Sequence, residues 1–150
     1  MKIKRFYPIL FLLLLCFQCD EGIEDCATVL CAGPPVIVME ILANGENVFE
    51  NETYSIEDVT IEGTNANDIT LSLFEDENSN TLLILENFNW EIGSNEYDLN
   101  FSSDTSIALQ IEIFQSGPGG CCGNIPILDG FRVNDVPQEG ANGSYTINLD

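Results

Sequence analysis

Apolar and polar side chains alternate with a period of two along most of the chain after residue 35, which is typical of half-buried β-strands. Two further runs, 36–42 and 81–85, are almost continuously apolar, and they predict a central strand and a second buried strand. The alternating segments are 58–62, 68–73, 88–92, 97–101, 107–113, 125–133 and 145–149. The segment 125–133 is compatible with one bent strand or two short strands.

Turn signals separate these runs at short intervals, for example at Asn44 and Gly45, at 75–80, at 93–95 and at 117–120. No segment shows a sustained helical period. Parallel strands need long crossover connections, and these short intervals leave no room for them. The sequence therefore predicts an all-β fold, an antiparallel β-sandwich of about eight or nine strands in one domain.

The N-terminal segment has the composition of a secretory signal peptide. Lys2, Lys4 and Arg5 form a positively charged region, and an apolar stretch follows at 6–17. A stretch of this length is too short to cross a hydrocarbon core of ~30 Å as a helix, which needs about 20 residues. A cleaved signal is therefore favoured over an uncleaved N-terminal anchor.

The end of the apolar stretch resembles a bacterial lipobox, in which a cysteine is acylated on its thiol. Two cysteines compete, Cys19 and the alternative Cys16. The residue before each, Gln18 or Leu15, departs from the small residue that lipoboxes carry there. The number of cysteines that remain favours Cys19. Lipidation of Cys19 leaves four later cysteines, which can pair, whereas lipidation of Cys16 leaves five and hence one unpaired thiol in an oxidising compartment. The resemblance implies attachment to a membrane through palmitate-like chains.

Acidic residues follow Cys19 directly, at 20–25, and resemble the export signals of some outer-membrane lipoproteins displayed on the cell surface. Together with the strand pattern, the chain resembles small bacterial surface lipoproteins with an immunoglobulin-like β-sandwich. We divide it into a signal peptide at 1–18, an acidic tether at 19–34 and a sandwich domain at 35–150. The resemblance implies a lipid-anchored location in the cell outer membrane.

The charge balance excludes several classes of function. The chain has 25 Asp and Glu, 4 Lys and Arg, and no His. All the acids follow residue 19, where Arg132 is the one basic residue. Nucleic-acid binding needs a basic footprint. A Ser-His-Asp or Cys-His pair needs histidine, and a Schiff base or phosphate loop needs lysine. We therefore expect no enzyme, and a carboxylate pair is the remaining catalytic option.

Four cysteines follow the lipidation site. Cys26 and Cys31 precede the first strand, and Cys121 and Cys122 share a glycine-rich loop. Outside the cytosol they predict two disulfides, with three possible pairings. A bond between adjacent cysteines departs from ordinary disulfide geometry, so we expect one bond from each of Cys26 and Cys31 to the Cys121–Cys122 loop. A zinc site is the alternative, but adjacent cysteines do not match the usual zinc spacing.

The segment 76–80 resembles the start of a calcium-binding loop. Thr81 and Asn87 stand where such a loop has its glycine and its final glutamate, so a polar hairpin turn is favoured. A looser Ca²⁺ site remains the alternative, and no other cofactor is expected. Its candidate ligands are Glu75, Asp76, Glu77, Asn78 and Asn80.

Aromatic residues offer a possible sugar-stacking platform at Tyr54, Phe88, Trp90 and Tyr97. Because Phe88 and Trp90 alternate with polar residues, core packing of both is favoured, and Tyr54 is expected to be the most exposed of the four. For Arg132 we expect an ion pair with one of the many acids.

These features favour a non-enzymatic, lipid-anchored cell-envelope protein, a surface-exposed binding or accessory module with an envelope protein as partner. The alternative is a calcium- or glycan-binding extracellular module. The acyl anchor would provide the membrane contact, since an anionic lipid surface repels the acidic body.

Overall fold

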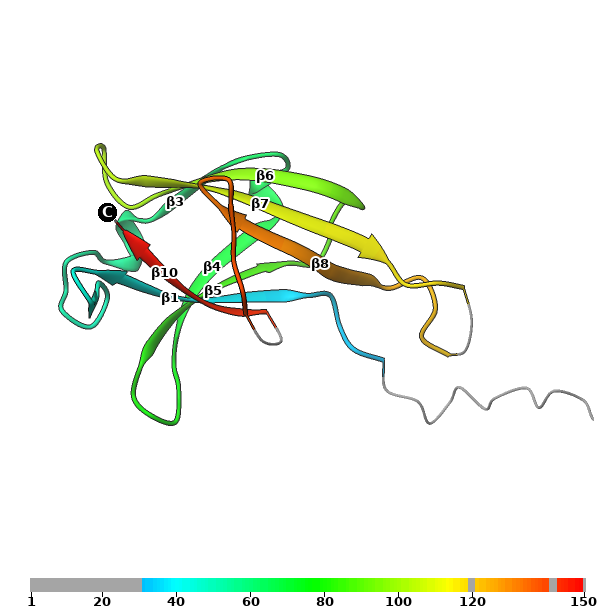
Figure 1. Ribbon diagram of the computed structural model, residues 1–150, viewed down its shortest axis with the longest axis horizontal. Coiled ribbons are helices and arrows are strands. Elements are labelled where there is room, and N and C mark those ends of the chain that lie inside the picture. The colour runs from blue at the N-terminus through cyan, green and yellow to red at the C-terminus, as the bar shows by residue number, and fades with distance from the viewer. Residues whose placement is uncertain (1–30, 119–120, 141–142, 150) are drawn as a thin grey trace, which may run out of the picture.

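The structure is a computed structural model that describes residues 31–118, 121–140 and 143–149. Two five-stranded sheets pack against each other as a β-sandwich (Figure 1). The prediction of an all-β sandwich is confirmed. Among the described residues no helix is long and apolar enough to cross a membrane.

The first sheet has the strand order β10–β1–β5–β4, and the short β2 pairs with β1. Its strands are β1 (Val36–Ala43), β2 (Glu46–Asn47), β4 (Ile69–Glu75), β5 (Thr81–Asn87) and β10 (Ser144–Leu149). Asn44 and Gly45 join β1 to β2 with φ values of 53° and 83°, as a two-residue hairpin of the Asn-Gly kind requires.

The second sheet has the order β3–β6–β7–β8–β9. Its strands are β3 (Thr60–Gly63), β6 (Gly93–Asn100), β7 (Ser106–Gln115), β8 (Pro126–Val133) and β9 (Val136–Pro137). Two short 3₁₀ helices, η2 (Ile56–Asp58) and η3 (Ala66–Asp68), flank β3. The segment 125–133 thus forms a single strand, and its register with β7 shifts between Glu112 and Ile113.

One strand pair departs from the predicted antiparallel arrangement. β1 and β10 run parallel, with Met39 beside Tyr145 and Ile41 beside Ile147. The long connection that a parallel pair needs is supplied by the rest of the domain, because these are the first and last described strands. The two-residue strands β2 and β9 bring the described strands to ten, above the predicted eight or nine.

The core consists of the inward-facing side chains of both sheets. On β7, the alternating residues Ile107, Leu109, Ile111 and Ile113 are all buried, as the period of two predicts. Burial of each such side chain stabilises the fold by about 1.5–3 kcal/mol. The aromatic pair Phe131 and Tyr145, with ring centroids 4.5 Å apart, joins β8 of one sheet to β10 of the other.

The outward-facing residues of the continuous apolar runs are half-buried instead of fully buried. β1 and β5 are central strands, and their inward residues are buried. Their outward residues Val36, Val38, Leu82 and Ile84 are only partly covered. The prediction that 36–42 forms a central strand is confirmed. The outward face stays partly exposed because the sandwich has two layers, and no third layer among the described residues covers it.

The segment 88–92 forms a connection between β5 and β6, so its predicted strand is wrong. Trp90 alone is buried there, while Phe88 is 75% exposed and Ile92 is 55% exposed. The Trp90 indole Nε1–H donates to the carbonyl oxygen of Pro35 at 2.8 Å. The side-chain amide of Asn95 donates to Glu91 O at 2.9 Å. Side-chain hydrogen bonds, which a polarity pattern does not reveal, therefore shape this segment.

Candidate functional site

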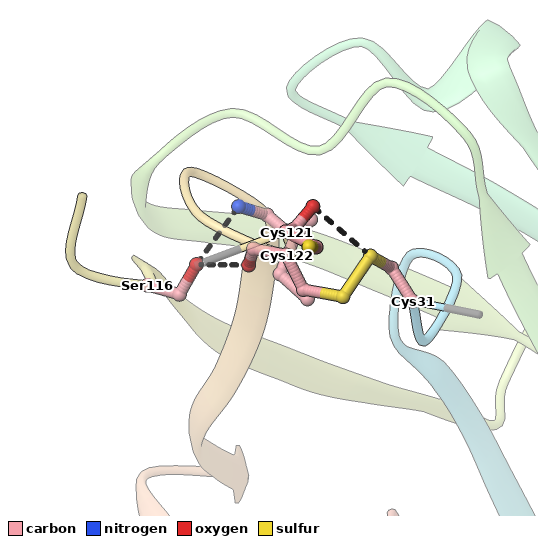
Figure 2. Close-up of a disulfide and its surroundings, with 5 residues drawn as sticks. Cys31, Ser116, Cys121 and Cys122 are labelled. Carbon is pink, nitrogen blue, oxygen red and sulfur yellow. Dashed lines mark hydrogen bonds between the residues drawn. A yellow bond between two sulfur atoms is a disulfide. The ribbon is translucent and has the colours of Figure 1, made fainter. Parts of the chain in front are cut away.

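The start of the described chain is joined by a disulfide to the loop between β7 and β8 (Figure 2). Cys31 and Cys122 are 91 residues apart in sequence, and their Cα atoms lie 5.3 Å apart. The predicted link from Cys31 to the Cys121–Cys122 loop is confirmed, and it excludes a four-thiolate zinc site because an oxidised sulfur is not a thiolate. Cys121 is also disulfide-bonded. Cys26, Cys19 and Cys16 lie outside the described residues.

Ser116 fixes the loop that carries this disulfide. Its N–H donates to Ile125 O at 2.9 Å, and its Oγ accepts from Ile125 N–H at 2.9 Å. The same hydroxyl donates to Cys122 O at 3.4 Å (Figure 2). With the indole bond to the Pro35 carbonyl, these contacts hold the chain that leads into β1 at the β7–β8 end of the sandwich.

A cleft of about 730 Å³ lies between the start of β1, β8 and the start of β10. Its lining includes Val36, Leu128 and Phe131, and two carboxylates, Asp129 and Glu139. Both carboxylates are exposed to solvent. A carboxylate hydrolase needs one carboxyl kept protonated by an apolar environment. Because neither carboxylate has such an environment, the cleft gives no support to a hydrolase.

The predicted polar turn at 76–80 is the hairpin between β4 and β5. Asp76 Oδ1 accepts from Asn78 N–H at 2.8 Å and from Asn80 N–H at 2.9 Å, and Oδ2 accepts from Asn80 Nδ2 at 3.0 Å. These bonds, chiefly that from the Asn80 N–H, hold the pKa of Asp76 below its ordinary value. Asp76 is therefore the residue that closes the turn.

The acidic candidate calcium ligands do not form a metal-binding cluster among the described residues. Both oxygens of Asp76 are engaged within the turn, and Glu75 and Glu77 are exposed. In the described ranges no group of three or more His, Cys, Asp or Glu side chains is arranged to hold a metal ion. The calcium site stays a prediction to which this geometry adds no support.

We expect the turn to weaken in acid because of Asp76. A lowered folded-state pKa means that its carboxylate stabilises the fold above the ordinary aspartate pKa, and this contribution is lost as the pH falls through the lowered value. A side-chain NMR titration should show Asp76 ionising below the ordinary aspartate range, and Asp76→Ala should broaden the amide signals of the turn. Glu77→Ala is the control and should leave those signals sharp. An ordinary pKa for Asp76 would contradict this assignment.

Arg132 lies on the solvent-facing side of β8, as expected from its place between buried Phe131 and Val133. Its Nε–H donates to the backbone carbonyl of Asp135 at 3.2 Å. The expected ion pair with a carboxylate is not found among the described residues. The guanidinium instead closes the short turn between β8 and β9, because that carbonyl lies three residues along the same chain.

The aromatic residues do not form a binding platform. Trp90 and Tyr97 pack edge to face inside the core, with ring centroids 6.5 Å apart. Tyr54 packs on Phe101 at 5.4 Å and donates from its hydroxyl to Thr105 Oγ1 at 3.2 Å. The expectation that Tyr54 is the most exposed of them is wrong, since Phe88 on the β5–β6 connection is.

Large apolar side chains are exposed in places that the sequence did not indicate. Phe74 on β4 is 53% exposed, and Leu73 beside it is also exposed. Phe74 is paired with Leu82 of β5 on the outer face of the first sheet. On the outer face of the second sheet, the cross-strand neighbours Phe114 and Ile127 are exposed. Exposed apolar side chains of this size are candidates for contact with a partner.

We take the β4–β5 hairpin as the candidate functional surface, because it combines exposed Leu73 and Phe74 with the acidic residues around its turn. Sequence reasoning found its turn but not its exposed apolar residues, because their exposure depends on which strand ends the sheet. No protein-family model, no curated protein and no solved structure significantly matches the chain.

Proposed function

We propose that this protein is a non-enzymatic, lipid-anchored cell-envelope protein that holds a rigid β-sandwich at the membrane as a binding or accessory module for a protein partner. The observation that carries the proposal is the Cys31–Cys122 disulfide. Disulfides of this kind persist in oxidising compartments and are rare in the cytosol. The signal-like segment at 1–18 and the candidate lipidation site Cys19 are consistent with such a compartment.

The position of this disulfide indicates which end of the sandwich would face the membrane. Cys31 and the β7–β8 loop lie at one end of the sandwich, whereas the tip of the β4–β5 hairpin lies towards the other end (Figure 1). A chain anchored upstream of Cys31 would thus keep the cysteine end near the membrane and present the hairpin away from it. The disulfide joins Cys31 to the β7–β8 loop, so the chain enters the domain at that end of the sandwich.

The charge of the chain supports a protein partner over a lipid or nucleic-acid partner. Arg132 is the one basic residue after residue 19, against 25 acidic residues in the same part of the chain. Such a surface is repelled by anionic lipid and by phosphate backbones, and it is attracted to basic protein surfaces. Charge complementarity of this kind raises association rates and suppresses wrong partners.

Replacement of the lipidated cysteine tests the anchor. Cells fed an alkyne-tagged fatty acid should label the wild-type chain and Cys16→Ser, while labelling of Cys19→Ser falls to background and the protein leaves the outer-membrane fraction. Thiol acylation has no substitute at serine, so the expected loss is complete. Loss of labelling in Cys16→Ser alone would move the anchor to Cys16. Unlabelled wild-type protein would overturn the proposal.

A further inference from the structure

The outer edge of β4 is a long uncovered strand edge. β4 ends the strand order of its sheet. Its seven residues include no proline, glycine or lysine, and their register with β5 has no bulge. Natural proteins usually blunt an edge with such features, because a free edge can pair with another chain. By comparison, the edge strand β3 has four residues, β9 has two and ends in Pro137, and β10, at the opposite edge of the first sheet, has six.

The hydrogen-bond alternation shows which backbone groups face outward from this edge. The Asp76 N–H donates to Asn80 O at 3.0 Å, which makes this residue pair a hydrogen-bonded pair next to the β4–β5 ladder. Bonded and non-bonded pairs alternate along an antiparallel ladder. Phe74 therefore bonds to β5, whereas Leu71 and Leu73 direct their N–H and C=O groups away from it. No described strand lies on that side of β4.

On the other strand of the same hairpin, β5, side chains cover the outward-facing backbone N–H and C=O groups. β5 extends beyond its pairing with β1, and there the Thr81 N–H donates to Glu50 Oε1 at 2.7 Å. The Asn47 side-chain amide donates to Thr81 O at 2.7 Å. Within the described part of the chain, no side chain covers Leu71 and Leu73 in this way. The two edges of one hairpin thus differ, and the β4 edge is the open one.

Apolar side chains accompany these open backbone groups. Leu73 faces the inner side of the sheet opposite buried Leu83, and Phe74 faces the outer side opposite Leu82. Leu73 and Phe74 are exposed because the hairpin extends past the body of the sandwich (Figure 1). A strand added along β4 would cover Leu73 on one face and Phe74 on the other, since successive side chains alternate between the faces of a sheet.

The charges at both ends of β4 indicate which kind of chain would bind along this edge. Exposed Asp68 directly precedes the strand, and Glu75, Asp76 and Glu77 lie at its other end. Arg132, the one basic residue in the described ranges, lies on β8 in the other sheet. An added strand therefore meets carboxylates at both ends and is favoured if it carries lysine or arginine there.

A second copy of this chain fits the edge poorly. Antiparallel self-pairing centred on Ser72 would place Leu71 opposite Leu73, which suits their outward-facing backbone groups. The same register would place Asp68 opposite Asp76 at both ends of the pair. Like charges directly opposite each other destabilise a strand pair, so this register disfavours a second copy, and the carboxylates at both ends of β4 favour a basic chain as the occupant.

We propose that the β4 edge binds an extended basic segment of a partner protein as an added β-strand. The backbone N–H and C=O groups of Leu71 and Leu73 bond to the added strand, and lysine or arginine side chains of that strand meet the carboxylates at the two ends of β4. This inference rests on the proposed function, which supplies a partner in the cell envelope.

Two substitutions at Leu73 test the backbone contact. The probe is a labelled synthetic peptide, Lys-Lys-Val-Thr-Val-Thr-Val-Lys-Lys, titrated by fluorescence anisotropy into the full chain in detergent micelles. Leu73→Pro removes an outward N–H without removing a ladder bond to β5, whereas Leu73→Ala removes the same side chain and keeps the N–H. We expect the proline variant to bind about tenfold more weakly than the alanine variant, with hydrogen-exchange protection of wild-type β4 by the peptide.

Charge reversal provides the second arm and decides the outcome if Leu73→Pro does not fold. The double variant Glu75→Lys with Glu77→Lys changes two exposed side chains. It should weaken binding of the basic peptide and strengthen binding of a matched peptide with glutamate in place of lysine. Four results would each overturn the proposal. Two concern binding strength, namely equal binding by the proline and alanine variants and no binding at millimolar peptide. The others are hydrogen-exchange protection away from β4 and a preference of the wild type for the acidic peptide. A concentration-dependent dimer that protects β4 would assign the edge to a second copy instead.

The same titration separates this proposal from the proposed function. Peptide binding should be unchanged in Cys19→Ser, and fatty-acid labelling should be unchanged in Leu73→Pro. If the protein is labelled by the fatty acid but does not bind the peptide, strand addition at β4 is wrong and the proposal of an anchored module stands. Peptide binding by a chain that is never labelled would remove the lipid anchor and leave the β4 edge as a binding site.

Discussion

Reduction of the disulfides should lower the free energy of unfolding by at least about 4–5 kcal/mol, because the chain-entropy relation already gives this value for the one loop that Cys31 and Cys122 close across 91 residues. The loop contains β1 to β7, which belong to both sheets, so in the unfolded chain the bond restricts segments of both sheets at once. A domain of this size has about 5–15 kcal/mol of stability in total. Urea unfolding with and without a reductant measures the difference.

The double variant Cys31→Ser with Cys122→Ser should lose much less than the reduced protein. Cys121 is also disulfide-bonded, and if its partner is Cys26 as the sequence predicts, that bond still closes nearly the same loop. Loss of the Cys31–Cys122 bond then opens only the short ring that the two disulfides close together. By the same chain-entropy relation, this lowers the free energy of unfolding by about 2 kcal/mol. A double variant that is as unstable as the reduced protein would contradict the predicted Cys26–Cys121 pairing.

Local sequence patterns predicted the strands whose alternation is uninterrupted. β7 and β10 follow the pattern residue by residue, because each has one face in the core and one in solvent. Patterns also predicted the turn at Asp76, since Asp and Asn form hydrogen bonds to nearby backbone groups. Cysteine parity and the unfavourable geometry of adjacent cysteines predicted the link from Cys31 to the Cys121–Cys122 loop.

The sequence could not predict features that depend on how distant segments meet. The parallel pairing of β1 with β10 joins the two ends of the domain, and no local signal marks it. Val48 and Phe49 are both buried although they are adjacent, because they lie in turns beyond β2 and not in a strand. The openness of the β4 edge follows from its place at the end of the sheet order, which only the assembled topology defines.

Phe101→Ala should cost about 3–5 kcal/mol, the usual range for truncation of a fully buried phenylalanine. Phe101 is 1% exposed and follows the end of β6. Its ring lies 6.4 Å from that of Phe49 and 5.4 Å from that of Tyr54, measured between centroids. Truncation therefore leaves a cavity and also detaches the turns after β2, which the sequence pattern did not assign to the core.

Phe114→Ala is the matched control, because the same side chain on β7 is 60% exposed and its loss leaves no cavity. Its cost in urea unfolding should stay within about 1 kcal/mol, as for other surface positions. Tyr54→Phe keeps the ring against Phe101 and removes only the hydroxyl that donates to Thr105, so its cost should be about 1 kcal/mol. If Phe101→Ala and Phe114→Ala cost the same, the segment around Phe49 and Tyr54 is not held by Phe101.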